Sequence, residues 1–255
     1  MTTPVRTSQY VDDQSGHAVW VRVIHWVATV SVLTLALTGV VILMAHPRLY
    51  WGEVGNDLTP ALFELPISRN HQHGGWEEPQ PFFADVSGPV SASRTFAIFN
   101  QNGWGRSLHF LGAWGLVIPG AAYLMLGIFG GHFRAHVWPG APELAPGVVW
   151  RDVVDHLRWH IPSASRGPRY GVLQKSAYTA VLFIVVPLIL VTGLAMSPAV
   201  TAALPVLLDI FGGYQSARTT HFFMFVALLL FVFVHIVMVI ASGFRRQIRA
   251  MTWGE

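Results

Sequence analysis

Two histidines on one long apolar stretch are the residues best placed to do chemistry. Residues 218–243 read RTTHFFMFVALLLFVFVHIVMVIASG and carry His221 and His235 with nothing else titratable between them. About 20 apolar residues suffice to cross a bilayer. A separation of fourteen positions (235 − 221) corresponds to a rise of about 21 Å and a return to within about 40° of the starting direction. We therefore expect two imidazoles on one helix face, each requiring a partner at its own membrane depth.

Composition restricts what those partners can be. Of 255 residues, 53% are hydrophobic, only 11% are charged and none is cysteine. Soluble domains are about 25% charged, so the chain is expected to be an integral membrane protein. The lack of cysteine excludes disulfides, thiolate-ligated iron–sulfur clusters and covalently attached c-type haem. Histidine must then hold any redox metal. The basic residues flank apolar runs, so they indicate topology and not binding to nucleic acid.

Four apolar spans must position the histidines. They are expected at about 20–44, 107–129, 175–197 and 218–242, joined by an outer loop over 45–106 and a cytoplasmic loop over 130–174. Helical periodicity also predicts an interfacial helix over Val148–His160, and the short apolar segment Ala199–Phe211 predicts a re-entrant or interfacial helix. The expected fold is a single domain over 1–255, an all-α membrane protein with a four-transmembrane-helix bundle and additional interfacial helices.

Basic residues predict the orientation of this bundle. The 45–106 loop is longer than the 130–174 connection but holds fewer arginines, and three more arginines follow the last span. The positive-inside rule then places both termini and the 130–174 loop in the cytoplasm. The first apolar run is too long for the core of a cleavable signal peptide, so none is expected.

This topology assigns a depth to each membrane histidine. His25 and His235 fall near the cytoplasmic face, whereas His109 and His221 fall near the outer face. Two bis-histidine sites at two depths, between the helices of a four-helix bundle, are typical of proteins that bind two b-type haems.

The spacing Arg-x-x-His accompanies three of these histidines. An arginine three positions away lies on the same helix face, and its guanidinium suits a haem propionate. The alternative is that arginines flank membrane spans in general. The three repeats are Arg22–His25, Arg106–His109 and Arg218–His221.

Gly39 lies fourteen residues after His25, on nearly the same helix face and at the depth of the outer site. A porphyrin edge approaching a helix needs a small residue there. Small-residue helix packing is an equal alternative.

These residues resemble a known family, the four-helix di-haem cytochrome b subunits of periplasmic hydrogenases, formate dehydrogenases and thiosulfate-reductase-type molybdoenzymes. The similar motifs are R-x-x-H-W from Arg22, a TG that closes the first span, His109 opening the second, TGLAM closing the third, and two histidines fourteen apart on the fourth. The segments HPRLYWGE (46–53) and GGYQSARTTHF (212–222) look closest to the thiosulfate-reductase-like branch.

The resemblance implies a function and partners. It implies a bacterial inner-membrane subunit that relays electrons between a periplasmic oxidoreductase of the molybdoenzyme or hydrogenase type, docked on the 45–106 loop, and the quinone pool. Quinone would react near the cytoplasmic face. The alternative for the candidate residues there is that they are ordinary interfacial anchors. The candidates are His132, Arg134, Lys175 and Tyr178. The chain's only enzymatic chemistry would be quinone redox. Homodimerisation is compatible with the sequence, which does not identify a dimer interface.

Two alternatives remain open. One is a stand-alone quinone-reactive cytochrome b, although such a protein has little use for a long outer loop. The other is a haem-free transporter or channel lined by histidines. It would require further polar groups along its path, but the four spans contain no Asp or Glu.

Overall fold

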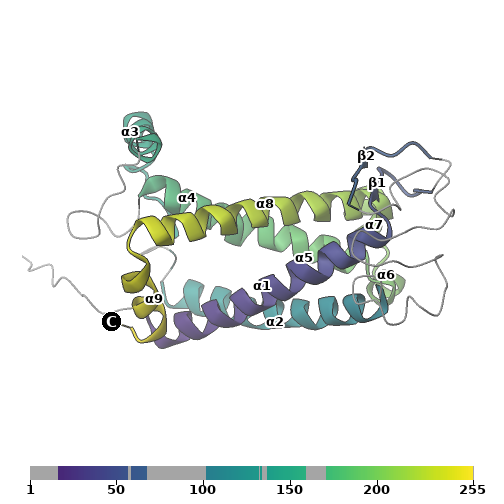
Figure 1. Cartoon of the computed structure of the whole chain (residues 1–255), viewed down its shortest axis with the longest axis horizontal. Helices are drawn as coiled ribbons and strands as arrows, with labels where there is room; N and C mark the ends of the chain where they lie inside the picture. The colour runs from purple at the N-terminus through teal and green to yellow at the C-terminus, as the bar shows by residue number, and fades with distance from the viewer. Residues whose placement is uncertain are drawn as a thin grey trace, which may run out of the picture.

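Four long apolar helices dominate the structure (Figure 1). The computed structural model describes residues 17–56, 59–67, 102–131, 133, 137–158 and 171–254. The first, second and fourth spans are α1 (Val19–Ala45), α2 (Asn102–Phe129) and α8 (Tyr214–Ala241). The third consists of α4 (Val172–Ala180), a π-helical turn η5 (Val181–Val185) and α5 (Val186–Ala195). Each is long and apolar enough to cross a membrane, which confirms the all-α membrane fold.

The π-helical turn ends at Val185, two residues before Pro187. Proline has no N–H, and its ring crowds the carbonyl four residues earlier in a regular α-helix. The N–H of Val186 instead bonds to the carbonyl of Val181, five residues back. This wider turn lets the third span continue past the proline without a break.

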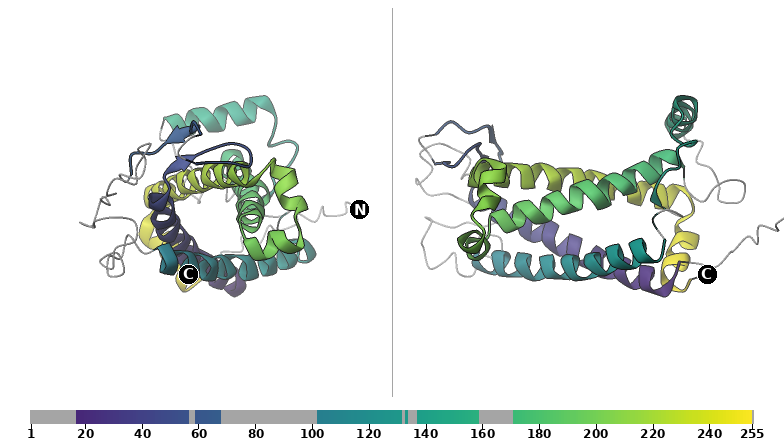
Figure 2. Two further views of the ribbon diagram at one scale, coloured as in Figure 1. Left: turned by 90° about the vertical axis from the view of Figure 1, so that its right-hand side faces the viewer. Right: turned by 180° about the vertical axis from the view of Figure 1, so that it is seen from behind.

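The spans pack as two pairs, α1 with α2 and α5 with α8. Glycines on α2 allow the first pair to approach closely, because a Cβ at Gly112 would lie 3.3 Å from Leu35 and one at Gly115 would lie 2.5 Å from Ser31 Oγ. Small residues are a common means of helix packing in membranes. Viewed end-on, the four spans surround a common axis (Figure 2).

The two ends of the bundle carry different structures (Figure 1). At the end we call the hairpin end, β1 (Arg48–Leu49) pairs antiparallel with β2 (Phe63–Glu64). The short helices α6 (Pro198–Ala203) and α7 (Val206–Phe211) lie at the same end of the bundle. The helix predicted over Ala199–Phe211 is thus two short helices separated at Pro205. At the opposite, α9 end lie α3 (Pro146–Leu157) and α9 (Phe244–Thr252).

The 46–56 segment is fastened to the beginning of α8. Arg218 donates from Nη1 to the Arg48 carbonyl at 2.8 Å and from Nη2 to the His46 carbonyl. Thr219 Oγ1 donates to the Tyr50 carbonyl at 2.6 Å, and the side chain of Tyr50 is only 1% exposed. These contacts fix the backbone of this segment three residues from His221.

Helix α9 folds back against the beginning of α1. Arg22 Nη1 donates to the Thr252 carbonyl at 2.8 Å, and the indole N–H of Trp26 donates to the Met251 carbonyl at 3.1 Å. The arginines of this segment indicated topology in the sequence, and no helix was predicted here.

Candidate haem-binding sites

At the hairpin end, His109 of α2 lies beside His221 of α8. Their ring centroids are 6.3 Å apart and the rings are tilted by 57°. Each histidine lies in the early part of its helix, and the two helices begin at the same end of the bundle. The structure therefore brings together the two histidines that the sequence analysis paired by depth.

At the α9 end, His25 of α1 lies beside His235 of α8 with nearly the same geometry. The centroids are again 6.3 Å apart, with a tilt of 55°. Helix α8 thus contributes one ring to each pair, and its partners come from α1 and α2.

The spacing within each pair fits one metal atom between the rings. A metal–imidazole bond is about 2.0 Å, as for zinc, so two imidazoles on opposite sides of one atom have centroids roughly 6 Å apart. No group of three or more His, Cys, Asp or Glu that could hold a metal occurs in the part of the chain that the structure describes. Pairs without further protein ligands suit a haem iron, because the macrocycle supplies the remaining ligands.

The surroundings of the rings also fit this group. His25 Nδ1 is buried and lacks a hydrogen-bond partner among the described residues. A Cβ at Gly39 would lie 3.6 Å from His109 Cε1, and a Cβ at Gly193 would lie 3.4 Å from His221 Cε1. These are ordinary contact distances, so the imidazoles alone do not require glycine. Glycine leaves that space open to a larger group beside each ring.

Two threonines contact the hairpin-end pair, which the sequence analysis did not foresee. Thr38 Oγ1 lies 2.9 Å from His109 Nδ1, and Thr192 Oγ1 lies 3.0 Å from His221 Nδ1. Both threonines are fully buried at 0% exposure. Both TG dipeptides could be recognised in the sequence. Each one contacts a histidine on another helix, so the contact itself could not be predicted.

The three arginines of the Arg-x-x-His repeats differ in their surroundings. Arg22 is half-buried beneath α9, Arg106 is exposed, and Arg218 is held by the backbone carbonyls of the 46–56 segment. Contact with haem propionates stays a prediction for all three.

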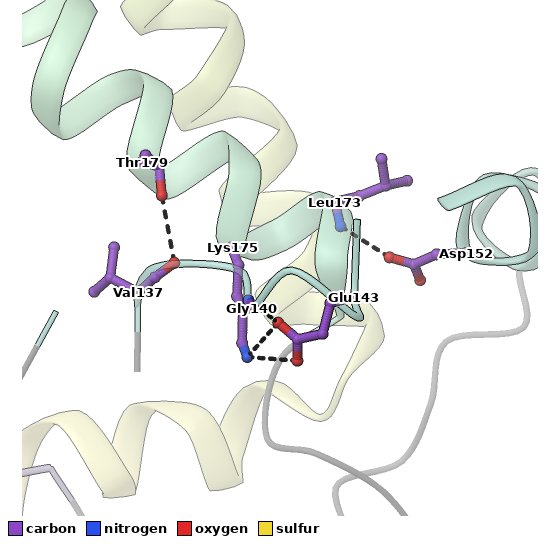
Figure 3. Close-up of polar contacts among 7 residues, drawn as sticks. All are labelled: Val137, Gly140, Glu143, Asp152, Leu173, Lys175 and Thr179. Atoms are coloured by element: carbon purple, nitrogen blue, oxygen red, sulfur yellow. Dashed lines mark hydrogen bonds and ion pairs between the residues drawn. The ribbon is translucent and has the colours of Figure 1, made fainter. Parts of the chain in front are cut away.

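Of the four candidate quinone residues, His132 and Arg134 lie outside the described residues. Lys175 Nζ bonds to Glu143 at 2.8 and 3.0 Å, and this contact fastens the connection before α3 to α4 (Figure 3). The hydrogen bond from Lys175, together with one from the Gly140 backbone, lowers the pKa of Glu143.

Tyr178 is joined to the α9-end histidines through an aromatic ring. Its hydroxyl accepts from Gln174 at 2.8 Å, and its ring meets Phe231 edge-on at 5.9 Å. Phe231 in turn stacks on His235 at 5.9 Å with only 17° between the planes. Phe231 gave no signal in the sequence, because it is one of many aromatic residues in an apolar span.

Four membrane-spanning helices with paired histidines at two depths define the class of four-helix membrane cytochromes. A family model described as prokaryotic cytochrome b561 matches residues 16–254, and the chain belongs to that family. It is therefore a b-type cytochrome of the membrane that takes part in electron transport. This confirms the resemblance to cytochrome b membrane subunits.

One curated relative is similar along most of its length. The chain is 28% identical over 223 residues to the putative protein-methionine-sulfoxide reductase subunit YedZ1 of Azospira oryzae, which covers 88% of this chain and 89% of the relative. No solved structure matches the chain.

Proposed function

We propose that the chain is a di-haem cytochrome b that relays electrons between a periplasmic oxidoreductase subunit and the membrane quinone pool. The observation that carries this proposal is the equal 6.3 Å spacing of two histidine pairs at opposite ends of α8. Each bound haem would supply one-electron redox chemistry. His25 with His235, and His109 with His221, would each hold one haem iron.

The residues around the pairs have supporting roles. Arg22, Arg106 and Arg218 would lie near the propionates, and Gly39 would leave room for a porphyrin edge. A rise of about 21 Å along α8 separates the two ligand positions. That separation suits transfer from one membrane face towards the other.

The hairpin end is the proposed docking surface for the partner. Trp51 and Val54 are 64% and 60% exposed on a backbone held to α8, and they belong to the outer loop 45–106. The similarity to a subunit of a methionine sulfoxide reductase supports a partner that is an oxidoreductase, in the manner of the molybdoenzyme or hydrogenase subunits. The α9 end would then face the cytoplasm, with both termini there, in a bacterial inner membrane.

Quinone would react at the α9 end, near Lys175 and Tyr178. The support comes from two ring contacts, because Tyr178 meets Phe231 and Phe231 stacks on His235. The Tyr178 hydroxyl is thereby connected to a proposed haem ligand. His132 and Arg134 remain candidates from the sequence alone.

Haem quantification tests the proposal directly. The chain is purified in detergent, haem is extracted and counted per polypeptide, and a reduced-minus-oxidised visible spectrum is recorded. Two b-type haems per chain are expected. One haem would overturn the assignment of one pair, and none in a folded sample would overturn the proposed relay.

A further inference from the structure

The same dipeptide contacts both histidines of the hairpin-end pair. Thr38–Gly39 on α1 faces His109 of the neighbouring α2, and Thr192–Gly193 on α5 faces His221 of the neighbouring α8. In each case the threonine meets Nδ1 and the glycine lies against Cε1. Both pairs of packed helices therefore hold their histidine in the same way.

The direction of these hydrogen bonds follows from the proton of each hydroxyl. Thr38 Oγ1 donates to the Thr34 carbonyl at 2.7 Å, and Thr192 Oγ1 donates to the Leu188 carbonyl at 2.6 Å. A hydroxyl has a single proton and two lone pairs. Because the helix carbonyl takes that proton, the oxygen must accept from the histidine, and Nδ1 must carry a hydrogen.

With Nδ1 protonated in this way, each neutral imidazole leaves the lone pair of Nε2 free to bind a metal.

The α9-end pair lacks this arrangement among the described residues. Thr29 lies one turn after His25, but its hydroxyl donates to the His25 backbone carbonyl at 2.8 Å. The buried Nδ1 of His25 has no hydrogen-bond partner in the described part of the chain. The two pairs share their ring spacing, but His25 Nδ1 lacks the threonine contact that both hairpin-end rings have.

We infer that Thr38 and Thr192 are positioning residues that hold His109 and His221 as Nδ1–H donors and lower the reduction potential of the hairpin-end haem. An acceptor on the N–H of a metal-bound imidazole orients the ring and raises its basicity. A more basic ligand stabilises the oxidised, more positive iron. This inference rests on the proposed function, because it needs a haem between these rings.

The test compares potentials in matched variants. Thr38→Val and Thr192→Val remove the hydroxyl and keep the shape, whereas Thr38→Ser and Thr192→Ser keep the hydroxyl. Thr34→Val is the control, because Thr34 makes the same bond to a helix carbonyl one turn earlier and no described contact to histidine. Each protein is titrated electrochemically with both haem absorptions followed, and low-spin electron paramagnetic resonance is recorded.

We expect each valine variant to raise one of the two midpoint potentials and leave the other unchanged. The expected rise is on the order of 59 mV, which corresponds to a tenfold change in the oxidised-to-reduced ratio for one electron. The serine variants and Thr34→Val should match the wild type. Loss of only the hairpin-end haem in the valine variants, restored by serine, would equally support the inference.

Two results would overturn it. One is a wild type with two haems whose potentials stay unchanged in both valine variants. The other is a shift or loss that serine does not restore or that affects both haems. Failure of the proposed function would be visible separately, as fewer than two haems in the wild type.

Discussion

The two histidine pairs have the same ring spacing in very different surroundings. At the hairpin end, buried threonine hydroxyls and glycines surround the rings, and the 46–56 segment is bonded to the helix just beyond them. At the α9 end, an aromatic ring stacks on His235 and the buried Nδ1 of His25 lacks a described partner. Helix packing therefore sets the spacing of the rings, whereas local polar contacts orient each ring.

Removing a hairpin-end ligand should have the largest effect. His221→Ala is expected to lose the hairpin-end haem and electron exchange with the partner, while most of the α9-end haem remains. Haem per chain should fall from about two to about one, because a metal-site ligand is lost outright. His156→Ala, a change on α3 outside the bundle, is the control and should keep both haems. Retention of both haems by His221→Ala would contradict the pairing.

The corresponding change at the α9 end removes a ligand of the other pair. His25→Ala is expected to lose the α9-end haem and quinone reactivity, and to keep the potential of the hairpin-end haem. Haem content and quinol-driven reduction of the purified chain measure both effects. Normal quinone turnover in this variant would rule out the relay that we propose.

Arg218 tests whether the fastening at the hairpin end matters for stability. Arg218→Gln should lower the free energy of unfolding by about 1–3 kcal/mol, because backbone carbonyls lose buried partners. Amide hydrogen exchange in residues 48–52 should accelerate, with no change at the α9 end. Arg106→Gln is the control, since Arg106 is exposed. Equal effects of the two substitutions would argue against a special role of the bonds from Arg218.

The smallest expected effect lies at the α9 end, in the Glu143–Lys175 ion pair. Lys175 holds the pKa of Glu143 below its ordinary value. The pair should therefore stabilise the fold above the unfolded-state pKa, about 4.3, and lose this effect as the pH falls through the lower folded-state value. Glu143→Gln should cost up to about 1 kcal/mol at pH 7 and less than that near pH 3.

Thermal unfolding at the two pH values measures this difference. Glu53→Gln, which removes an exposed carboxylate at the hairpin end, is the control. A cost of Glu143→Gln that persists unchanged at pH 3 would show that the ion pair is not its source.

The sequence predicted the spans and the proximity of the paired rings because both depend on regular helix geometry. A separation of fourteen residues sets the relative positions of His221 and His235 on any straight helix. The charges of the loops indicate which helix ends lie on the same side of the membrane. The threonine contacts were beyond such reasoning. Thr192 meets His221 only through the packing of α5 on α8, and no periodicity encodes the rotation of one helix against another. Helix α9 was missed although Phe244, Ile248 and Met251 recur at helical spacing, because the arginines between them were interpreted only as topology signals.

The π-helical turn before Pro187 has a consequence for length variation among relatives. Such a turn holds about one residue more than an α-helical turn. Loss of one residue within Val181–Val185 can therefore be absorbed there, with Tyr178 and Thr192 still on their present sides of the span. The same loss between Pro187 and Thr192 would turn this threonine by about 100° away from His221. Homologous chains one residue shorter in this span are expected to have their gap in η5.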